Sequence, residues 1–202
     1  FVTGMAQTHY GFELEGEYKP FDVLGFNFAG SLNNWEYTKD VTGTYKDYAN
    51  PDSEKEYNYY VNGLKVGDSP QTQFVLGLTV YPAKGLRAQL LGKFYADHYA
   101  AWDPFTRSDE NDKEQVWKTP SYTVFDLHAS YDLPINSDVM GVQFFVHVFN
   151  LFDEIFVQDA VDNSPYNGYY GENDEYSHQP WTAEVYLGTP RVVNFGVLMN
   201  LY

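Results

Sequence analysis

Apolar and polar side chains alternate with a period of two residues along most of the chain, and no segment sustains a helical period. Seven segments carry this alternation: residues 10–18, 25–37, 72–81, 86–100, 121–131, 142–152 and 191–202. In the clearest of them, Leu86 and Ala88 flank Arg87. Successive side chains of a strand point to opposite faces, so the pattern predicts an all-β fold whose sheet has one apolar and one polar face.

The connections between these segments are short after the first, third and fifth, and long after the second, fourth and sixth. Transmembrane barrels combine short periplasmic turns with longer extracellular loops in just this way. The sequence therefore predicts an antiparallel transmembrane β-barrel whose last strand ends on the periplasmic side. Because a bacterial single-chain barrel has an even number of strands and at least eight, we expect the 202 residues to form one segment of a larger barrel.

Composition adds two constraints. Aromatic residues make up 19% of the chain, with many of the 19 Tyr near the ends of the predicted strands, as the aromatic girdles of a membrane barrel require. A formal net charge of -16 excludes nucleic acid as a partner, because phosphate binding needs a basic surface.

A soluble β-sandwich would also show alternating strands, with the apolar face turned inward. Two observations favour the barrel: the alternation runs for about a dozen residues where an ordinary strand has five or six, and the polar face carries many titratable groups. We expect these groups to line a hydrated lumen. They are Glu13, Glu15, Glu17, Arg87, Lys93, Asp97, Asp126, His128 and His147.

Three short motifs near the end of the chain resemble those of TonB-dependent outer-membrane receptors. They are FNLFD at residues 149–153, YLGTPR at residues 186–191 and the terminal NFGVLMNLY at residues 194–202. The last resembles the β-signal that the barrel-assembly machinery reads. Its signal positions would be Asn194, Gly196, Met199, Leu201 and Tyr202. Residues 11–20 and 66–71 are similar to elements of the same receptors, with a Bacteroidota-like character.

The resemblance implies much that lies outside these residues. A complete receptor would have an N-terminal plug and a barrel of about 22 strands in the outer membrane of a Gram-negative bacterium, with residues 1–202 as the C-terminal part of the barrel and the plug absent. Its partners would be outer-membrane lipids, the rest of the barrel, the plug and the TonB–ExbB–ExbD complex. It would import a scarce nutrient such as an iron–siderophore complex, with no enzymatic activity and no cofactor.

Two alternatives stay open. A SusC-like glycan importer would have the same barrel, paired with a surface lipoprotein. A soluble β-sandwich binding module belongs to another class.

Two polar clusters suggest metal sites, and for each we prefer a simpler interpretation. A hairpin of the fifth and sixth segments would place Asp126 opposite His147 with His128 one diagonal away, a set that could bind a transition metal. Polar groups facing a lumen more often bond to water or to a plug. Residues 153–182 contain many carboxylates and no Lys or Arg, which could suit Ca²⁺, but a solvated acidic loop explains them better.

Aromatic residues in the predicted long loops are the best candidates for ligand contact, because exposed aromatics are costly unless they touch something. They are Trp102, Tyr166, Tyr169, Tyr170, Tyr176 and Trp181. No catalytic motif is present, so we expect a binding and transport protein and not an enzyme.

Overall fold

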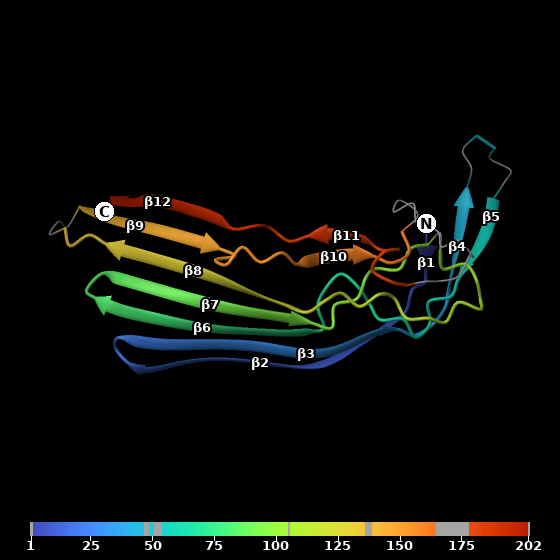
Figure 1. The fold of residues 1–202 in the computed structure, drawn as a ribbon, viewed down its shortest axis with the longest axis horizontal. Coiled ribbons are helices and arrows are strands. Elements are labelled where there is room, and N and C mark those ends of the chain that lie inside the picture. Colours follow the sequence, from blue (N-terminus) through green and yellow to red (C-terminus); the bar gives the residue numbers. More distant parts are fainter. Residues whose placement is uncertain are drawn as a thin grey trace.

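The computed structural model describes residues 2–46, 49–50, 54–104, 106–135, 139–164 and 178–201. Its largest element is a seven-stranded antiparallel sheet in the order β12-β9-β8-β7-β6-β3-β2 (Figure 1). The strands are β2 (Gln7–Phe21), β3 (Leu24–Tyr37), β6 (Thr72–Ala83), β7 (Leu86–Ala96), β8 (Tyr122–Asp132), β9 (Met140–Phe149) and β12 (Val192–Leu201). The predicted all-β antiparallel fold is thus confirmed, with one strand for each alternating segment.

The described part of the chain holds no helix long and apolar enough to cross a membrane.

Two predicted strands end earlier in the structure than the alternation suggests. β7 stops at Ala96 and not at residue 100, and β9 stops at Phe149 and not at residue 152. The next residue in each case, Asp97 or Asn150, has a positive φ of 52° or 50°, which no extended strand accommodates. Both residues belong to types that tolerate this left-handed conformation, so local backbone geometry ends the strands.

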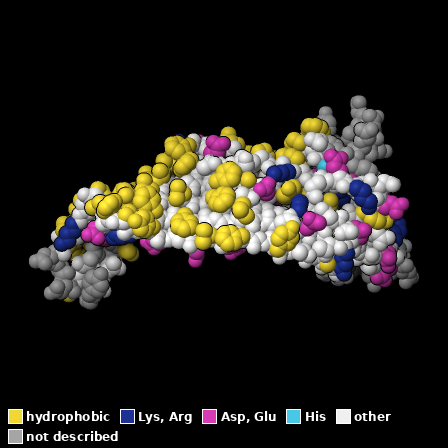
Figure 2. All heavy atoms as spheres, turned by 90° about the horizontal axis from the view of Figure 1, so that it is seen from below, with side chains coloured by type: hydrophobic (Ala, Val, Ile, Leu, Met, Phe, Trp, Pro, Cys, Tyr) yellow, Lys and Arg dark blue, Asp and Glu magenta, His cyan; other side chains and the backbone are white. Residues whose placement is uncertain are grey.

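The register of the paired strands places their apolar side chains on one continuous face of the sheet. Phe12 pairs with Leu32, and Val148 with Val193, so side chains of the same face meet at every strand boundary. This face is open: Phe195 is 83% exposed and Leu201 82%. In Figure 2 hydrophobic side chains gather over the strands, whereas Lys, Arg, Asp and Glu gather over the loops. An exposed apolar area of this extent requires an apolar environment.

Three glycines on the apolar face lie beneath phenylalanine rings of the neighbouring strand. A Cβ built at Gly16 would lie 2.6 Å from Cζ of Phe28, and one at Gly30 would lie 2.7 Å from Cδ1 of Phe74. The Phe125 ring covers Gly92 in the same way. The glycines therefore make room for large rings while the strands keep their close spacing.

At the end of the sheet opposite the short turns, the long loops contain structure that the alternation did not predict. A small sheet joins β1 (Val2–Thr3), β4 (Val41–Lys46) and β5 (Glu54–Tyr59), and a hairpin joins β10 (Val157–Val161) to β11 (Glu184–Leu187). The hydrophobic core lies here, around Val61, Leu64 and Val116. The short turns and the end of β12 lie at the opposite end of the sheet (Figure 1). We call the two ends the loop end and the turn end.

Candidate functional site at the loop end of the polar face

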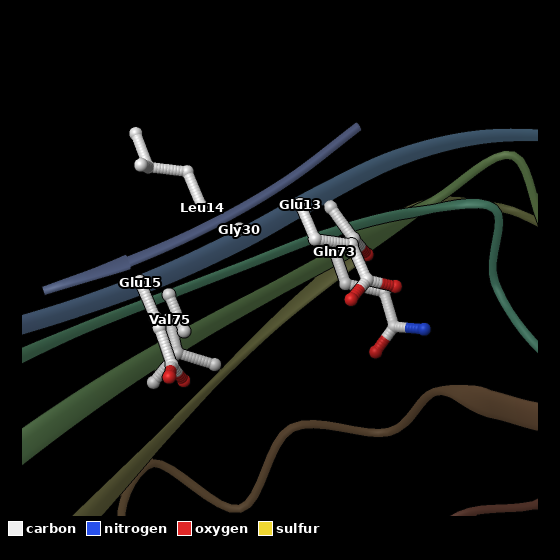
Figure 3. A pocket seen from close by; sticks show the side chains of 8 residues that line it. Glu13, Leu14, Glu15, Gly30, Gln73 and Val75 are labelled. Atoms are coloured by element: carbon white, nitrogen blue, oxygen red, sulfur yellow. The ribbon is translucent and has the colours of Figure 1, made fainter. Parts of the chain in front are cut away.

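Side chains of the polar face project away from the apolar face, as the alternation predicts. In Figure 3 Glu13, Glu15, Gln73 and Val75 point to one side of the sheet and Leu14 to the other. They line a hollow of about 550 Å³. Glu13, Glu15 and Glu17 are exposed or half-exposed and form no ion pair with any described residue.

Asp126 is a structural residue of this face. It is 2% exposed, forms an ion pair with Lys93 on β7 and accepts a hydrogen bond of 2.9 Å from the backbone N–H of Asn150. Its carboxylate thus connects three segments: β7, β8 and the turn that follows β9. A buried carboxylate with this many partners is fully satisfied and has little capacity left for a ligand.

The predicted pairing of Asp126 with His147 is wrong. In the actual register His128 lies opposite His147, and the two Nδ1 atoms are 2.8 Å apart. The difference of two residues keeps the side chains on their predicted face but moves the carboxylate away from the imidazole pair. Among the described residues no group of three His, Cys, Asp or Glu side chains is arranged to hold a metal ion, so the structure gives the transition-metal alternative no support.

The remaining predicted lumen residues have different surroundings. Arg87 lies within β7, opposite Ser130 on β8. Asp97 lies just beyond the end of β7, where it accepts hydrogen bonds from Lys118 at 2.5 Å and from Thr72 Oγ1 at 2.6 Å. These bonds, that of Lys118 first, hold the pKa of Asp97 below its ordinary value. Asp97 therefore joins a long loop to the sheet.

A second cavity, of about 400 Å³, lies where the polar face meets the loops. We call it the loop-end cavity. It is lined by Asp68, Pro70, Lys93, Tyr95, Tyr122, Val124, Phe156, Gln158 and Asp159. These residues come from β7, β8, the segment before β6 and the start of β10 with the residue that precedes it. The cavity thus depends on the sheet and two loops at once, and the alternation pattern gave no sign of it.

One wall of the loop-end cavity is a row of three aromatic rings, of which one pair is tilted and the other stacked. Tyr95 and Tyr122 have centroids 5.1 Å apart, and Tyr122 stacks on Phe156 at 4.3 Å with 22° between the ring planes. Behind Phe156 lies Gly188, where a Cβ would be only 2.0 Å from Cζ of that ring. The glycine of the YLGTPR motif is therefore needed for the position of the stack.

His98 lies near the carboxylates of this cavity. It is 2% exposed, and neither ring nitrogen has a hydrogen-bond partner among the described residues. Burial lowers the pKa of His98, and the nearby charges of Asp159 and Asp68 offset this only in part. Burial thus disfavours the cationic form of this imidazole.

The two predicted ligand-contacting aromatics that the structure describes, Trp102 and Trp181, do not line this cavity. Trp102 packs into the loop core, with its ring centroid 5.7 Å from that of Tyr59 and 6.3 Å from that of Tyr37. Trp181 is exposed. Tyr166, Tyr169, Tyr170, Tyr176 and also Tyr202 lie outside the described residues.

The FNLFD and YLGTPR motifs meet in one hydrogen-bonded turn after β9. The Asn150 side chain donates to the carbonyl oxygens of Glu154 at 2.9 Å and Thr189 at 3.1 Å, and it accepts from the Glu154 N–H at 2.8 Å. Asp153 accepts from the backbone N–H of Arg191 at 2.7 Å. The two motifs thus hold the end of β9 against the start of β12.

A buried ionic cluster connects the long loops. Arg107 pairs with Asp112 at 2.8 Å and with Asp162 at 3.4 Å, and His178 contacts the same two carboxylates at 3.0 Å and 2.5 Å. Burial lowers the pKa of His178, but the hydrogen bonds to Asp112 and Asp162 outweigh burial and raise it to about 9. With His178 protonated, two cations balance two carboxylates. Nothing in the local sequence pattern indicated this cluster, because its members are 71 residues apart at the extreme.

Residues 2–151 match the family model described as TonB dependent receptor-like, beta-barrel. Among solved structures, a chain of the ferric-catecholate import receptor Fiu from E. coli K12 is similar, with 15% identity and a TM-score of 0.40. The match covers 96% of this chain and only 27% of the Fiu chain. No curated protein matches the sequence significantly.

Proposed function

The chain belongs to the TonB-dependent receptor β-barrel family, and from this premise we propose that it forms part of the wall of an outer-membrane transporter that imports a scarce nutrient. The observation that carries the proposal is the sheet itself: a continuous, open apolar face on one side and a polar face with a ligand-sized cavity on the other. A lipid-facing exterior and a hydrated interior are what such a wall needs.

The proposed orientation follows from the ends of the sheet. The turn end would face the periplasm and the loop end the exterior, where the loop-end cavity would meet incoming ligand. The plug and the remaining strands would be supplied outside residues 1–202. Transport would then consist of binding at the loop end and release through a plug moved by the TonB–ExbB–ExbD complex, without covalent chemistry.

The soluble β-sandwich alternative has little support. A sandwich buries the apolar face of one sheet against a second sheet. Within the described residues, the smaller sheets β1-β4-β5 and β10-β11 lie at the loop end, and the apolar face of the large sheet stays exposed.

Single cysteines test the orientation, because residues 1–202 contain no Cys. In the full-length receptor we would place one by Asn62→Cys at the loop end and one by Asp22→Cys in the β2–β3 turn. Both positions are exposed. A membrane-impermeant maleimide should label the first variant in intact cells and the second only after the outer membrane is permeabilised. Equal labelling of both in intact cells would contradict the orientation.

Transport is tested in cells with and without the full-length receptor, each in a background with and without TonB. The probes are a ferric tris-catecholate, a ferric hydroxamate, cobalamin and mixed neutral oligosaccharides. We expect accumulation of at least one probe to require both proteins. Accumulation that is identical in all four strains would count against transport. Co-purification of a lipoprotein would favour the SusC-like alternative.

A further inference from the structure

We propose that the loop-end cavity binds an uncharged, hydroxyl-rich ligand of the sugar class and not an anionic iron chelate. This inference rests on the proposed transport function and names the class of its substrate. Three features of the cavity support it: its charges, its aromatic rings and its rigidity.

The charge of the cavity disfavours anions. Asp68 and Asp159 line it, and neither forms an ion pair with a described residue. Lys93 is the one cation among the lining residues, and its ammonium group is already paired with Asp126. Burial disfavours the cationic form of His98, which lies near both carboxylates. An anionic chelate would therefore meet two carboxylates and no unpaired cation among the lining residues.

The chemistry of the lining suits a sugar. A sugar ring has an apolar face of C–H groups and an edge of hydroxyl groups. The rings of Tyr95 and Tyr122 offer an apolar wall, and carboxylates accept hydroxyl protons in strong charge-assisted hydrogen bonds. Gln158 can both donate and accept. The cavity thus combines hydrogen-bond acceptors with an aromatic wall.

The arrangement of the rings distinguishes a sugar from an organic cation, which the same charges would also attract. A cation site surrounds its ligand with aromatic faces. Here Tyr122 and Phe156 stack on one another at 4.3 Å, so they form a single wall, and the rest of the lining combines polar side chains with Pro70 and Val124.

The wall is held in place before any ligand arrives. Gly188 backs Phe156, and its N–H donates to the Phe156 carbonyl at 2.9 Å. Tyr95 and Tyr122 stand on paired positions of β7 and β8. A preformed wall lowers the entropy cost of binding, which matters for a ligand whose hydroxyl groups bond equally well to water.

The test uses the full-length receptor in detergent and equilibrium dialysis followed by mass spectrometry. Three probes are compared: mixed neutral oligosaccharides from starch, xylan and mannan hydrolysates, a ferric tris-catecholate, and spermidine. The variant Asp68→Asn/Asp159→Asn keeps side-chain size and removes both charges. Asp22→Asn, in the β2–β3 turn at the far end of the sheet, is the matched control.

We expect the wild type and the Asp22→Asn control to retain neutral oligosaccharides, and the double variant to bind them roughly tenfold more weakly as charge-assisted hydrogen bonds become neutral ones. Retention of the ferric chelate or of spermidine in place of sugar overturns the inference, as does sugar binding that the double variant leaves unchanged. Retention of none of the three also overturns it. The four-strain uptake assay decides separately on transport, so failure of the two claims can be told apart.

Discussion

The carboxylate of Asp126 accepts a hydrogen bond from the backbone N–H of Asn150, so a side chain in the middle of the sheet holds the residue that follows the end of the neighbouring strand. Asn150 in turn bonds to Glu154 and to the Thr189 carbonyl, which precedes β12. The motif residues after β9 and before β12 thus form one network of hydrogen bonds and ion pairs with Lys93 and Asp126. This network is the physical reason for the short sequence motifs.

Removal of the Asp126 carboxylate should destabilise the barrel. We expect Asp126→Ala to cost about 2–4 kcal/mol, because it leaves the Lys93 ammonium and a buried N–H without their acceptor. Asp126→Asn should cost less, since the amide oxygen still accepts from Asn150. Urea unfolding of the full-length receptor in lipid measures both. Glu15→Gln, an exposed change on the same face, is the control and should have no measurable effect.

A charged side chain should destabilise the receptor more on the apolar face of the sheet than on the polar face. Leu76→Arg, in the middle of β6, should cost about 2–4 kcal/mol if its side chain contacts lipid. Val75→Arg on the adjacent position points into the polar face and should cost far less. The amount of folded receptor in the outer-membrane fraction and its urea midpoint report the difference. Equal losses for the two variants would mean that the apolar face does not meet lipid.

Gly188→Ala should displace the Phe156 ring from the aromatic stack. Since a Cβ would lie 2.0 Å from Cζ of that ring, we expect a loss of about 1–3 kcal/mol, as overpacked sites show. Phe156→Leu shortens the opposing side chain, so the double variant Gly188→Ala/Phe156→Leu should recover part of the loss. A double-mutant cycle from urea unfolding measures this coupling. Strict additivity of the two changes would exclude a direct clash.

The ionic cluster of the loops should weaken at alkaline pH. The pKa of His178 is about 9 in the folded protein and near its ordinary value of 6.5 in the unfolded chain. Protonated His178 therefore contributes its full stabilisation below about pH 6.5, and the contribution is lost as pH rises through 9. Urea unfolding at pH 6, 7.5 and 9.5 should show a decline that His178→Gln abolishes. An equal decline in the variant would assign it to other groups.

Much of the sheet could be predicted because each of its strands obeys a single local rule. Segments such as residues 25–37 and 121–131 alternate for long enough that the period of two is unmistakable, and the lengths of the connections then give the topology. The register of His128 and His147 could not be predicted in the same way. A shift of two residues leaves each side chain on the same face of the sheet. The hydrophobic pattern therefore cannot distinguish two registers that differ by two residues.

The loop end escaped prediction for a different reason. β4, β5 and β10 have five or six residues each, too few for alternation to stand out, and they form because distant segments pack together. Trp102 shows the consequence: this loop aromatic, a candidate for ligand contact from the sequence, packs against the loop core beside Tyr37 and Tyr59. The loop-end cavity draws on four separate segments, and no local pattern brings such residues together.

The core around Val61, Leu64 and Val116 lies beyond the strands, at the loop end. The ordinary hydrophobic effect of water stabilises this core, whereas in the proposed outer-membrane location the apolar face of the sheet would contact lipid hydrocarbon. In that location water would stabilise the loop core, and lipid would stabilise the sheet. Urea, which acts from the aqueous phase, should unfold the loop core before it unfolds the sheet. A harsh detergent should unfold the sheet first.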